Sequence, residues 1–259
     1  MIICFSGTGN SLQVAETLAP LIDDNVTLLP DLGEITDNRV VWVCPIYSWG
    51  IPPVVLDTIK ALPDQTGREH HLVATCGDDC GLADRMFRDA IAERGAQSGV
   101  IATVIMPNNY VALPGFDVDS HETARRKLDA TPERVASIAR MILNDDSLTD
   151  VTHGSMAWIK TRIIYPWFVR NEMSPKRFHS TDACIGCGIC SLTCPLGNID
   201  MVNGSSHQVP CWGDNCAACF RCYHICPHHA IGYGKSTKSK KQYVNPTLME
   251  NLKKLNKIK

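Results

Sequence analysis

The sequence predicts two parts of different fold class, an N-terminal α/β domain with a doubly wound parallel sheet and a small C-terminal α+β domain rich in cysteine. Two observations carry this prediction. Short apolar runs alternate with amphipathic segments from residue 1 to about 146, which is typical of strands and helices that alternate in a parallel sheet. Nine of the thirteen cysteines lie between Cys184 and Cys226, outside that region.

Five apolar runs are expected to form the sheet, because continuous apolar character suits strands covered on both faces. They are Ile2–Ser6, Val26–Leu29, Val40–Ile46, Leu72–Cys76 and Val100–Met106. The amphipathic segments expected to be helices are Ser11–Leu21, Val54–Leu62, Leu82–Arg94 and His121–Leu143. Five strands and four helices match a doubly wound five-stranded sheet with the strand order 2-1-3-4-5.

The C-terminal cysteines form two copies of one pattern, C-x2-C-x2-C-x3-C-P. The copies are Cys184, Cys187, Cys190 and Cys194 before Pro195, and Cys216, Cys219, Cys222 and Cys226 before Pro227. This spacing is typical of paired [4Fe-4S] clusters, in which the fourth cysteine of each run binds the other cluster. The expected ligand sets are therefore Cys184, Cys187, Cys190 with Cys226, and Cys216, Cys219, Cys222 with Cys194.

Zinc and disulfides are the alternatives for such a group of cysteines. Structural zinc usually joins two C-x2-C pairs over a longer gap, whereas each run here already holds four cysteines. Disulfides need an oxidising compartment, and the chain begins Met1-Ile2-Ile3-Cys4 with no basic, cleavable signal segment, so a cytoplasmic location is expected. The spacing favours clusters, and Cys211, outside both runs, is expected to be a packing thiol.

The first expected strand leads into a loop of hydroxyls and glycines, Ser6-Gly7-Thr8-Gly9-Asn10-Ser11. Backbone N–H groups beside a helix N-terminus, together with hydroxyls, favour a phosphate. The loop has no lysine as in a Walker loop, and Leu12 stands where a dinucleotide motif has its third glycine. We expect it to bind one terminal phosphate, although a Gly/Ser turn after a strand is common in any α/β domain.

The segment Phe5–Ser11 resembles the phosphate loop of flavodoxins, and this resemblance implies an FMN cofactor. In the order 2-1-3-4-5 the ligand lies where the strand order reverses, so the loops after the third and fourth strands are expected to line the flavin. The residues expected to bind FMN are Ser6, Gly7, Thr8, Gly9, Asn10, Ser11, Pro45, Ile46, Tyr47, Ser48, Trp49, Gly50, Thr75, Cys76, Gly77 and Asp78.

Each of the later loops has a simpler alternative. Tyr47 and Trp49 stack near a flavin in one interpretation and cap the core beside prolines in the other. Asp78 and Asp79 would disfavour an anionic reduced flavin, or they are solvated loop residues. Cys76 and Cys80 are expected to be inert packing thiols, as are Cys4 and Cys44 in the predicted strands.

The whole chain resembles the flavodoxin and ferredoxin fusion family of anaerobic bacteria and archaea, which joins an FMN domain to a domain with two [4Fe-4S] clusters. The expected division is 1–146 for the flavodoxin-like domain, 147–180 for a connecting helix broken at Pro166, 181–234 for the ferredoxin-like domain and 235–259 for a basic tail. The tail carries eight lysines and one acid, Glu250, as a docking patch or a solvated segment.

Charge and hydropathy exclude some classes of partner. The formal net charge of −2 favours neither nucleic acid nor an anionic membrane. The longest apolar stretch of the C-terminal half, Ala157–Val169, contains Lys160, Arg162 and Pro166, so it is too short and too charged to span a bilayer. Partners are therefore expected among redox proteins and small electron acceptors.

The resemblance implies electron transfer, and two functions stay open. The first is a relay that passes electrons between the clusters and FMN to a redox partner, favoured by the basic tail and by the lack of an evident acid/base residue. The second is an FMN-dependent reductase of a quinone or unsaturated compound, with Trp49, Asn108, Asn109 and Tyr110 around the acceptor. A redox sensor that uses Cys76 or Cys211 is a third alternative.

Overall fold

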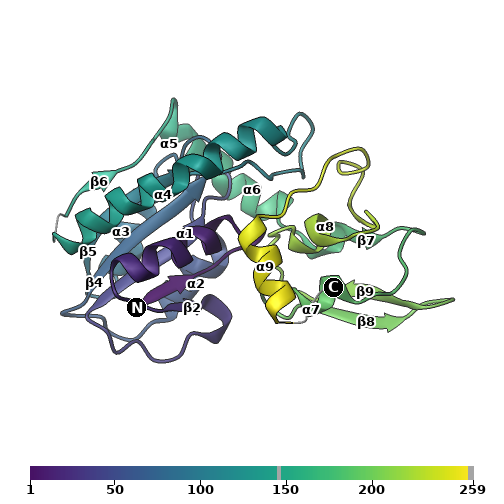
Figure 1. Cartoon of the computed structure of the whole chain (residues 1–259), viewed down its shortest axis with the longest axis horizontal. Helices are drawn as coiled ribbons and strands as arrows, with labels where there is room; N and C mark the ends of the chain where they lie inside the picture. Colours follow the sequence, from purple (N-terminus) through teal and green to yellow (C-terminus); the bar gives the residue numbers. More distant parts are fainter. Residues whose placement is uncertain (145–146, 256–259) are drawn as a thin grey trace. The chain divides into compact units, whose positions relative to one another are not determined.

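The computed structural model describes residues 1–144 and 147–255, and it divides into two compact units (Figure 1). Unit 1 contains Met1–Ser6, Asn10–Pro107 and Ser120–Val169. Unit 2 contains Gly7–Gly9, Asn108–Asp119 and Arg170–Lys259. Each unit is thus assembled from three stretches of chain rather than from one half of the sequence.

Unit 1 is built on a parallel sheet with the order β2-β1-β3-β4-β5-β6. The strands are β1 (Ile2–Cys4), β2 (Val26–Leu28), β3 (Arg39–Pro45), β4 (Glu69–Cys76), β5 (Gln97–Ile105) and β6 (Thr149–Asp150). The first five confirm the predicted order 2-1-3-4-5, which is that of flavodoxin-like sheets. The sixth is an additional edge strand, and its two residues are too few to carry a recognisable apolar pattern.

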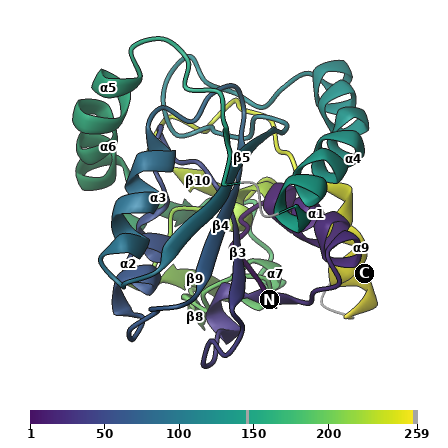
Figure 2. The same cartoon turned by 90° about the vertical axis from the view of Figure 1, so that its left-hand side faces the viewer.

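Helices cover both faces of this sheet. Their bounds are α1 (Asn10–Leu18), α2 (Pro53–Ala61), α3 (Ala83–Ala92) and α4 (His121–Leu143). Figure 2 shows α1 and α4 on one face and α2 and α3 on the other. This two-sided cover explains why Val40, Val41 and Val43 are fully buried although they point to opposite faces.

The segment expected to be a helix broken at Pro166 is a continuous helical run. It consists of α5 (Ala157–Ile159), a π-helical turn (Lys160–Ile164) and α6 (Tyr165–Glu172). Pro166, the second residue of α6, has no N–H and so cannot donate a hydrogen bond to the carbonyl one turn earlier. The helix has its wider π turn, Lys160–Ile164, directly before this position and continues through the proline. The predicted break is therefore wrong. Among residues 1–144 and 147–255 no helix is both long and apolar enough to cross a membrane.

Unit 2 contains two small antiparallel sheets. One pairs β7 (Phe178–Ser180) with β10 (Ile231–Tyr233), and the other pairs β8 (Ile199–Asn203) with β9 (Gln208–Trp212). Two short helices, α7 (Ile189–Leu192) and α8 (Arg221–Ile225), lie at equivalent places in the cysteine runs. Ile199–Met201 and Ala230–Tyr233, which follow the two cysteine runs at equivalent places, contribute to β8 and β10, so the repeat in the sequence is also a repeat in structure.

An aromatic group forms the core of unit 2. The ring centroids of Phe178, Phe220 and Tyr233 lie 4.6 to 5.1 Å apart. Val111 and Ala112 belong to the same core and are fully buried in it. This packing explains why 108–119 groups with unit 2 although it follows the last long strand of unit 1.

The basic tail is folded along most of its described length. Asn245 begins α9 (Pro246–Lys254) by accepting a hydrogen bond from the Thr247 N–H at 2.9 Å, as a helix cap does. Leu248 and Leu252 are buried on one side of this helix. One side of α9 is therefore packed, whereas its lysines Lys253 and Lys254 are exposed to solvent.

Candidate functional site

The two cysteine runs line two separate cavities in unit 2. The first cavity is lined by Cys184, Cys187, Cys190 and Cys226, and the second by Cys194, Cys216, Cys219 and Cys222. The volume of the first cavity is about 350 Å³ and that of the second is about 340 Å³, when the part of each cavity that is open to solvent is included. Each cavity takes three cysteines from one run and one from the other, which is the grouping of the crossed ligand pattern. That iron occupies them stays a prediction.

Backbone N–H groups are turned toward several of these sulfurs. The Asn198 N–H lies 3.4 Å from Cys194 Sγ, that of Ala218 lies 3.4 Å from Cys216 Sγ, and that of Ala230 lies 3.3 Å from Cys226 Sγ. Such donors stabilise negative charge on sulfur and raise the reduction potential of iron-sulfur clusters. The donor set and its amide surroundings therefore fit a thiolate-bound cluster.

Burial favours the protonated thiol at four of the eight cysteines until a metal binds. It raises the pKa of Cys190 and of Cys216 to about 11, and it also raises the pKa of Cys219 and of Cys222. Cluster assembly must therefore release protons from these thiols. In the part of the chain that the structure describes, no three His, Cys, Asp or Glu side chains meet closely enough to hold one metal ion. In a cube each cysteine binds its own iron atom.

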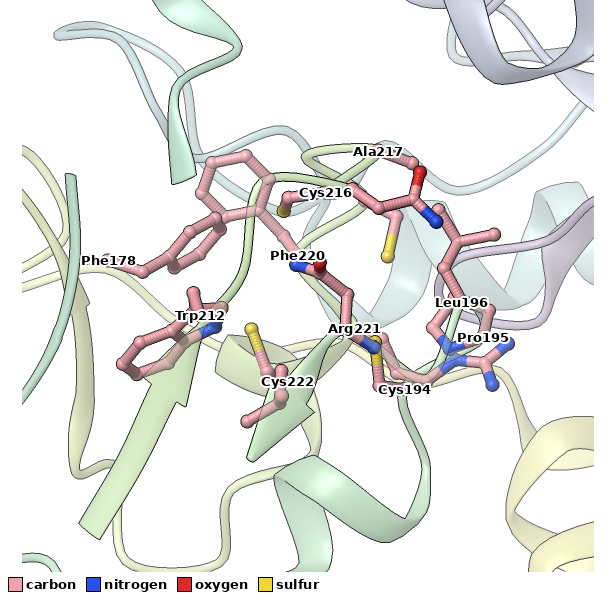
Figure 3. A pocket seen from close by; sticks show the side chains of 14 residues that line it. Phe178, Cys194, Pro195, Leu196, Trp212, Cys216, Ala217, Phe220, Arg221 and Cys222 are labelled. Atoms are coloured by element: carbon pink, nitrogen blue, oxygen red, sulfur yellow. The ribbon is translucent and has the colours of Figure 1, made fainter. Parts of the chain in front are cut away.

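Trp212 of β9 lines the second cavity (Figure 3). Its ring stacks on Phe178 with centroids 5.6 Å apart and planes 15° from parallel, which fixes the direction of the indole N–H. Figure 3 shows the indole nitrogen turned toward the sulfur of Cys222. Trp212 Nε1 is buried and has no partner at hydrogen-bond distance among the described residues. Burial raises the pKa of the Cys222 thiol, and the indole N–H acts against this rise because it favours the thiolate.

Arg221 of α8 connects the second cavity to the predicted phosphate loop. Its Nε donates to the carbonyl oxygen of Gly7 at 2.5 Å, and its Nη1 donates to that of Thr193 at 2.8 Å. Its charge opposes the burial that raises the pKa of Cys219. A Cβ atom on Gly7 would lie 2.8 Å from the Cys219 carbonyl oxygen, so only glycine allows this close approach.

The phosphate loop is buried along its whole length, from Ser6 to Ser11. The Gly7 carbonyl accepts from Arg221, and the Thr8 carbonyl accepts from the Asn245 N–H at 2.8 Å. Because a trans peptide sets C=O and the following N–H in opposite directions, the N–H groups of Thr8 and Gly9 point away from these partners. This orientation fits a phosphate held beside the N-terminus of α1.

The polar side chains of the loop have protein partners. The Ser11 and Thr75 hydroxyls are 2.8 Å apart, so within unit 1 the first and third predicted loops meet. Asn10 Nδ2 donates to the Pro107 carbonyl at 2.9 Å. Thr8 Oγ1 accepts from Asn109 Nδ2. A phosphate would therefore use the backbone N–H groups first, with the hydroxyls as additional donors.

The second predicted loop forms a tight turn, with Tyr47 and Gly50 joined by two backbone hydrogen bonds of 2.9 and 3.0 Å. Ser48 and Trp49 adopt φ angles of 44° and 66°, a left-handed conformation that is uncommon outside glycine and typical of functional sites. The connecting helix fixes this turn. The Thr161 hydroxyl donates to the Trp49 carbonyl at 2.8 Å, and Lys160 Nζ lies 4.9 Å from the centre of the Trp49 ring.

The third loop carries balanced rather than excess negative charge. Lys160 Nζ pairs with Asp79 at 2.7 Å, and Lys127 Nζ donates to the Gly77 carbonyl at 2.8 Å. Burial raises the pKa of Cys76 above its usual range and that of Cys80 to about 12. Both thiols are therefore inert at neutral pH, as expected. Cys4 and Cys44 are buried in strands as predicted, whereas Cys211 is exposed and is not a packing thiol.

Three of the four residues expected around an organic acceptor, Asn108, Asn109 and Tyr110, make contacts within unit 2, whereas Trp49 belongs to unit 1. The Asn109 carbonyl is 2.9 Å from His224 Nε2, and Tyr110 packs edge-on against Phe116 and Phe220. The Asn108 N–H donates to Asp119 at 2.9 Å. Sequence reasoning missed Lys127, Lys160, Arg221 and Trp212. Only Lys160, a charge inside an apolar helix, carries a signal of its own.

Comparisons with known proteins match both parts of the chain. The family described as the 4Fe-4S binding domain matches residues 178–200, which include the first cysteine run. No match was found among curated proteins. Among solved structures, a flavodoxin of Streptococcus pneumoniae TIGR4 is 17% identical over 55% of this chain and 96% of its own, with a TM-score of 0.39.

Two further solved structures are similar over the same part of the chain. A flavodoxin of Fusobacterium nucleatum bound to flavin mononucleotide is 14% identical over 56% of this chain and 96% of its own, with a TM-score of 0.39. An azoreductase of Bacillus anthracis is 12% identical over 53% of this chain and 97% of its own, with a TM-score of 0.35.

The strand order of unit 1 and the family match in unit 2 define the class of protein. A flavodoxin-like sheet with the order 2-1-3-4-5 is joined in one chain to a 4Fe-4S binding domain. This organisation is similar to that of a fusion between a flavodoxin and a ferredoxin.

Proposed function

We propose that this protein transfers electrons between two [4Fe-4S] clusters and an FMN, and that it relays them to or from a redox partner. The observation that carries the proposal is the pair of cavities in unit 2, each lined by four cysteines with one cysteine crossing from the other run. When bound, the clusters exchange single electrons, and FMN exchanges one or two.

The residues of the chain act by positioning in this proposal. The cysteines hold the irons, and the backbone N–H groups at Asn198, Ala218 and Ala230 stabilise charge on the sulfurs. Gly7 touches Cys219 through its backbone, so the predicted phosphate loop begins directly at a predicted ligand of the second cavity. This contact lies within unit 2 and joins a residue of the predicted phosphate loop to a predicted cluster ligand.

Phosphate binding would depend on the loop Ser6–Ser11, with Lys127 and Lys160 as fixed positive charges at the other two loops of unit 1. These lysines would counter the negative charge that a reduced flavin carries. A reductase that acts on an organic acceptor remains the second candidate. Its proposed residues Asn109 and Tyr110 are engaged in packing and hydrogen bonds, so the relay is the better supported function.

The first test is the cofactor content of the full chain purified without oxygen. We expect about eight irons, about eight acid-labile sulfides and one FMN per chain. Two irons, or zinc in place of iron, would contradict the cluster assignment. Iron and sulfide in full amount without FMN would contradict the flavin assignment alone.

A second test separates the phosphate loop from the clusters. The substitution Thr8→Val keeps the shape of the side chain and removes its hydroxyl, so FMN should bind roughly 10- to 100-fold more weakly, the equivalent of about 1.5–3 kcal/mol for a hydrogen bond to a charged group. Thr131→Val, at a buried threonine of α4, is the matched control and should leave FMN affinity unchanged. Fluorescence titration of flavin-free protein measures both, and iron content should stay full.

A further inference from the structure

The two cavities differ in two residues that the repeat does not share. Arg221 lies between the second and third cysteines of its run, where Ile189 stands in the first run. Trp212 reaches the second cavity from β9, whereas the same strand gives Pro210 to the first. The second cavity therefore has a positive charge and an N–H donor at places where the first has apolar groups.

These two residues act on different sulfurs of the second cavity, Arg221 on Cys219 and Trp212 on Cys222. The Trp212 N–H faces Cys222, with no competing partner at hydrogen-bond distance among the described residues. The Arg221 guanidinium is held in place by the Gly7 and Thr193 carbonyls, and Thr193 directly precedes Cys194. An N–H dipole and a fixed positive charge both stabilise the more negative, reduced state of a cluster.

The other charges near the two runs are balanced. Asp182 and Asp214 each lie two residues before the first cysteine of a run, and both are exposed. His228, which lines the first cavity, is exposed to solvent. Solvent acts in the opposite direction, because Cys187 of the first cavity is exposed and water also stabilises a reduced cluster. The difference in solvent exposure concerns one ligand, Cys187, whereas Arg221 adds a full positive charge beside the second cavity that solvent screens only weakly.

We propose that the cluster held by Cys194, Cys216, Cys219 and Cys222 has the higher reduction potential of the two, set by Arg221 and Trp212. This inference rests on the proposed function, since it requires both clusters. The order favours transfer of one electron from the first cluster, which is oxidised, to the second, which is reduced. Electrons from an external one-electron donor would therefore collect on the second cluster, whose ligand Cys219 contacts Gly7 of the predicted phosphate loop within unit 2.

The test is a redox titration of the full chain, purified without oxygen and followed at pH 8 by visible absorption and electron paramagnetic resonance. We expect two cluster transitions. Trp212→Phe keeps the ring on Phe178 and removes the N–H, so it should move only the higher transition to a more negative potential. Trp158→Phe, at an exposed tryptophan of α5, is the matched control and should move neither.

Two charge variants test the same order of the two reduction potentials without any change at Trp212, so an effect of Trp212→Phe on folding cannot influence them. Arg221→Gln should lower the higher transition, and Ile189→Arg should raise the lower one, so that each brings the two potentials together. With full iron content, equal potentials in the wild type, or a shift of the lower transition in Trp212→Phe and Arg221→Gln, would overturn the inference. Half the expected iron in the wild type would instead contradict the proposed function.

Discussion

The two cysteine cavities share a spacing pattern and differ in what surrounds it. The first has an exposed ligand, Cys187, and apolar neighbours such as Ile189. The second has Arg221 and Trp212 and touches Gly7 through Cys219. The repeated residues thus define which cofactor each cavity suits, and the unrepeated residues define how the two cavities differ. A duplicated motif can in this way supply two unlike steps of one electron path.

The largest expected effect comes from removing one ligand of each cavity. Cys187→Ala and Cys219→Ala should each lose about four of about eight irons, because a cube needs its four thiolates. Cys219→Ala should also leave unit 2 less stable than Cys187→Ala does, because Cys219 is half-buried whereas Cys187 is exposed, and a void left among packed atoms costs packing energy. Iron analysis and the denaturant midpoint measure the two effects. Equal midpoints would show that the cavities are alike in stability.

A smaller effect is expected where the second cavity meets the phosphate loop. Gly7→Ala places a Cβ 2.8 Å from the Cys219 carbonyl oxygen, and backbone on both sides must shift. We expect a loss of about 1–3 kcal/mol in the free energy of unfolding. Gly33→Ala, where a Cβ meets nothing within 4 Å, is the control and should stay within about 0.5 kcal/mol of wild type. An unchanged Gly7→Ala protein would argue against this contact.

A buried histidine of the sheet, His70, should make the stability of the protein depend on pH. His70 of β4 is fully buried and accepts a hydrogen bond from Trp42 Nε1 at 3.0 Å, and burial lowers its pKa to about 4. The unfolded chain therefore binds the proton first as pH falls. Stability is full above about pH 6.5 and is lost from there toward pH 4.

Between pH 7 and 5.5 this residue should account for a loss of about 1 kcal/mol in the free energy of unfolding. His70→Gln retains a side-chain acceptor for Trp42 and should flatten the pH dependence over that range, as measured by denaturant unfolding. His121→Gln, at an exposed histidine of α4, should leave the slope as in the wild type. If His70→Gln also kept the wild-type slope, acid sensitivity would have to come from another group.

The smallest effect is expected at Cys211, which is exposed on β9 next to Trp212 and lines neither cavity. Cys211→Ser should keep full iron and sulfide and change the free energy of unfolding by less than about 0.5 kcal/mol. Loss of iron in this variant would mean that a ninth cysteine takes part in cluster binding, and it would change the ligand sets of both cavities.

The sequence was sufficient where structure depends on local patterns. Continuous apolar runs such as Val40–Ile46 predicted the strands of unit 1, and the spacing within each cysteine run predicted which cysteines share a cavity. The edge strand β6 escaped prediction because Thr149–Asp150 has no pattern of its own. At Pro166 the prediction was wrong because a π turn accommodates the missing N–H.

The sequence did not predict the contacts between stretches that lie far apart in the chain. Nothing in Gly7–Gly9 indicates that Arg221 and Asn245 bind its carbonyls, since these partners lie more than 200 residues away. Lys160 and Trp212 likewise gain their roles only from tertiary packing beside Trp49 and Cys222. A single sequence predicts which residues have the chemistry of a site, whereas the surroundings that tune them come from the fold.

The grouping of Gly7–Gly9 and 108–119 with unit 2 limits how this chain can be divided. A shortened chain that ends at Val169 would retain the whole parallel sheet, yet it would lack Arg221, Asn245 and Leu248, which contact Gly7–Gly9 within unit 2. Cleaving the chain at one position therefore does not separate unit 1 from unit 2, because the stretches of the two units alternate along the sequence. A shortened chain that keeps unit 2 intact must therefore contain residues 7–9 and 108–119 as well as the stretch that begins at Arg170.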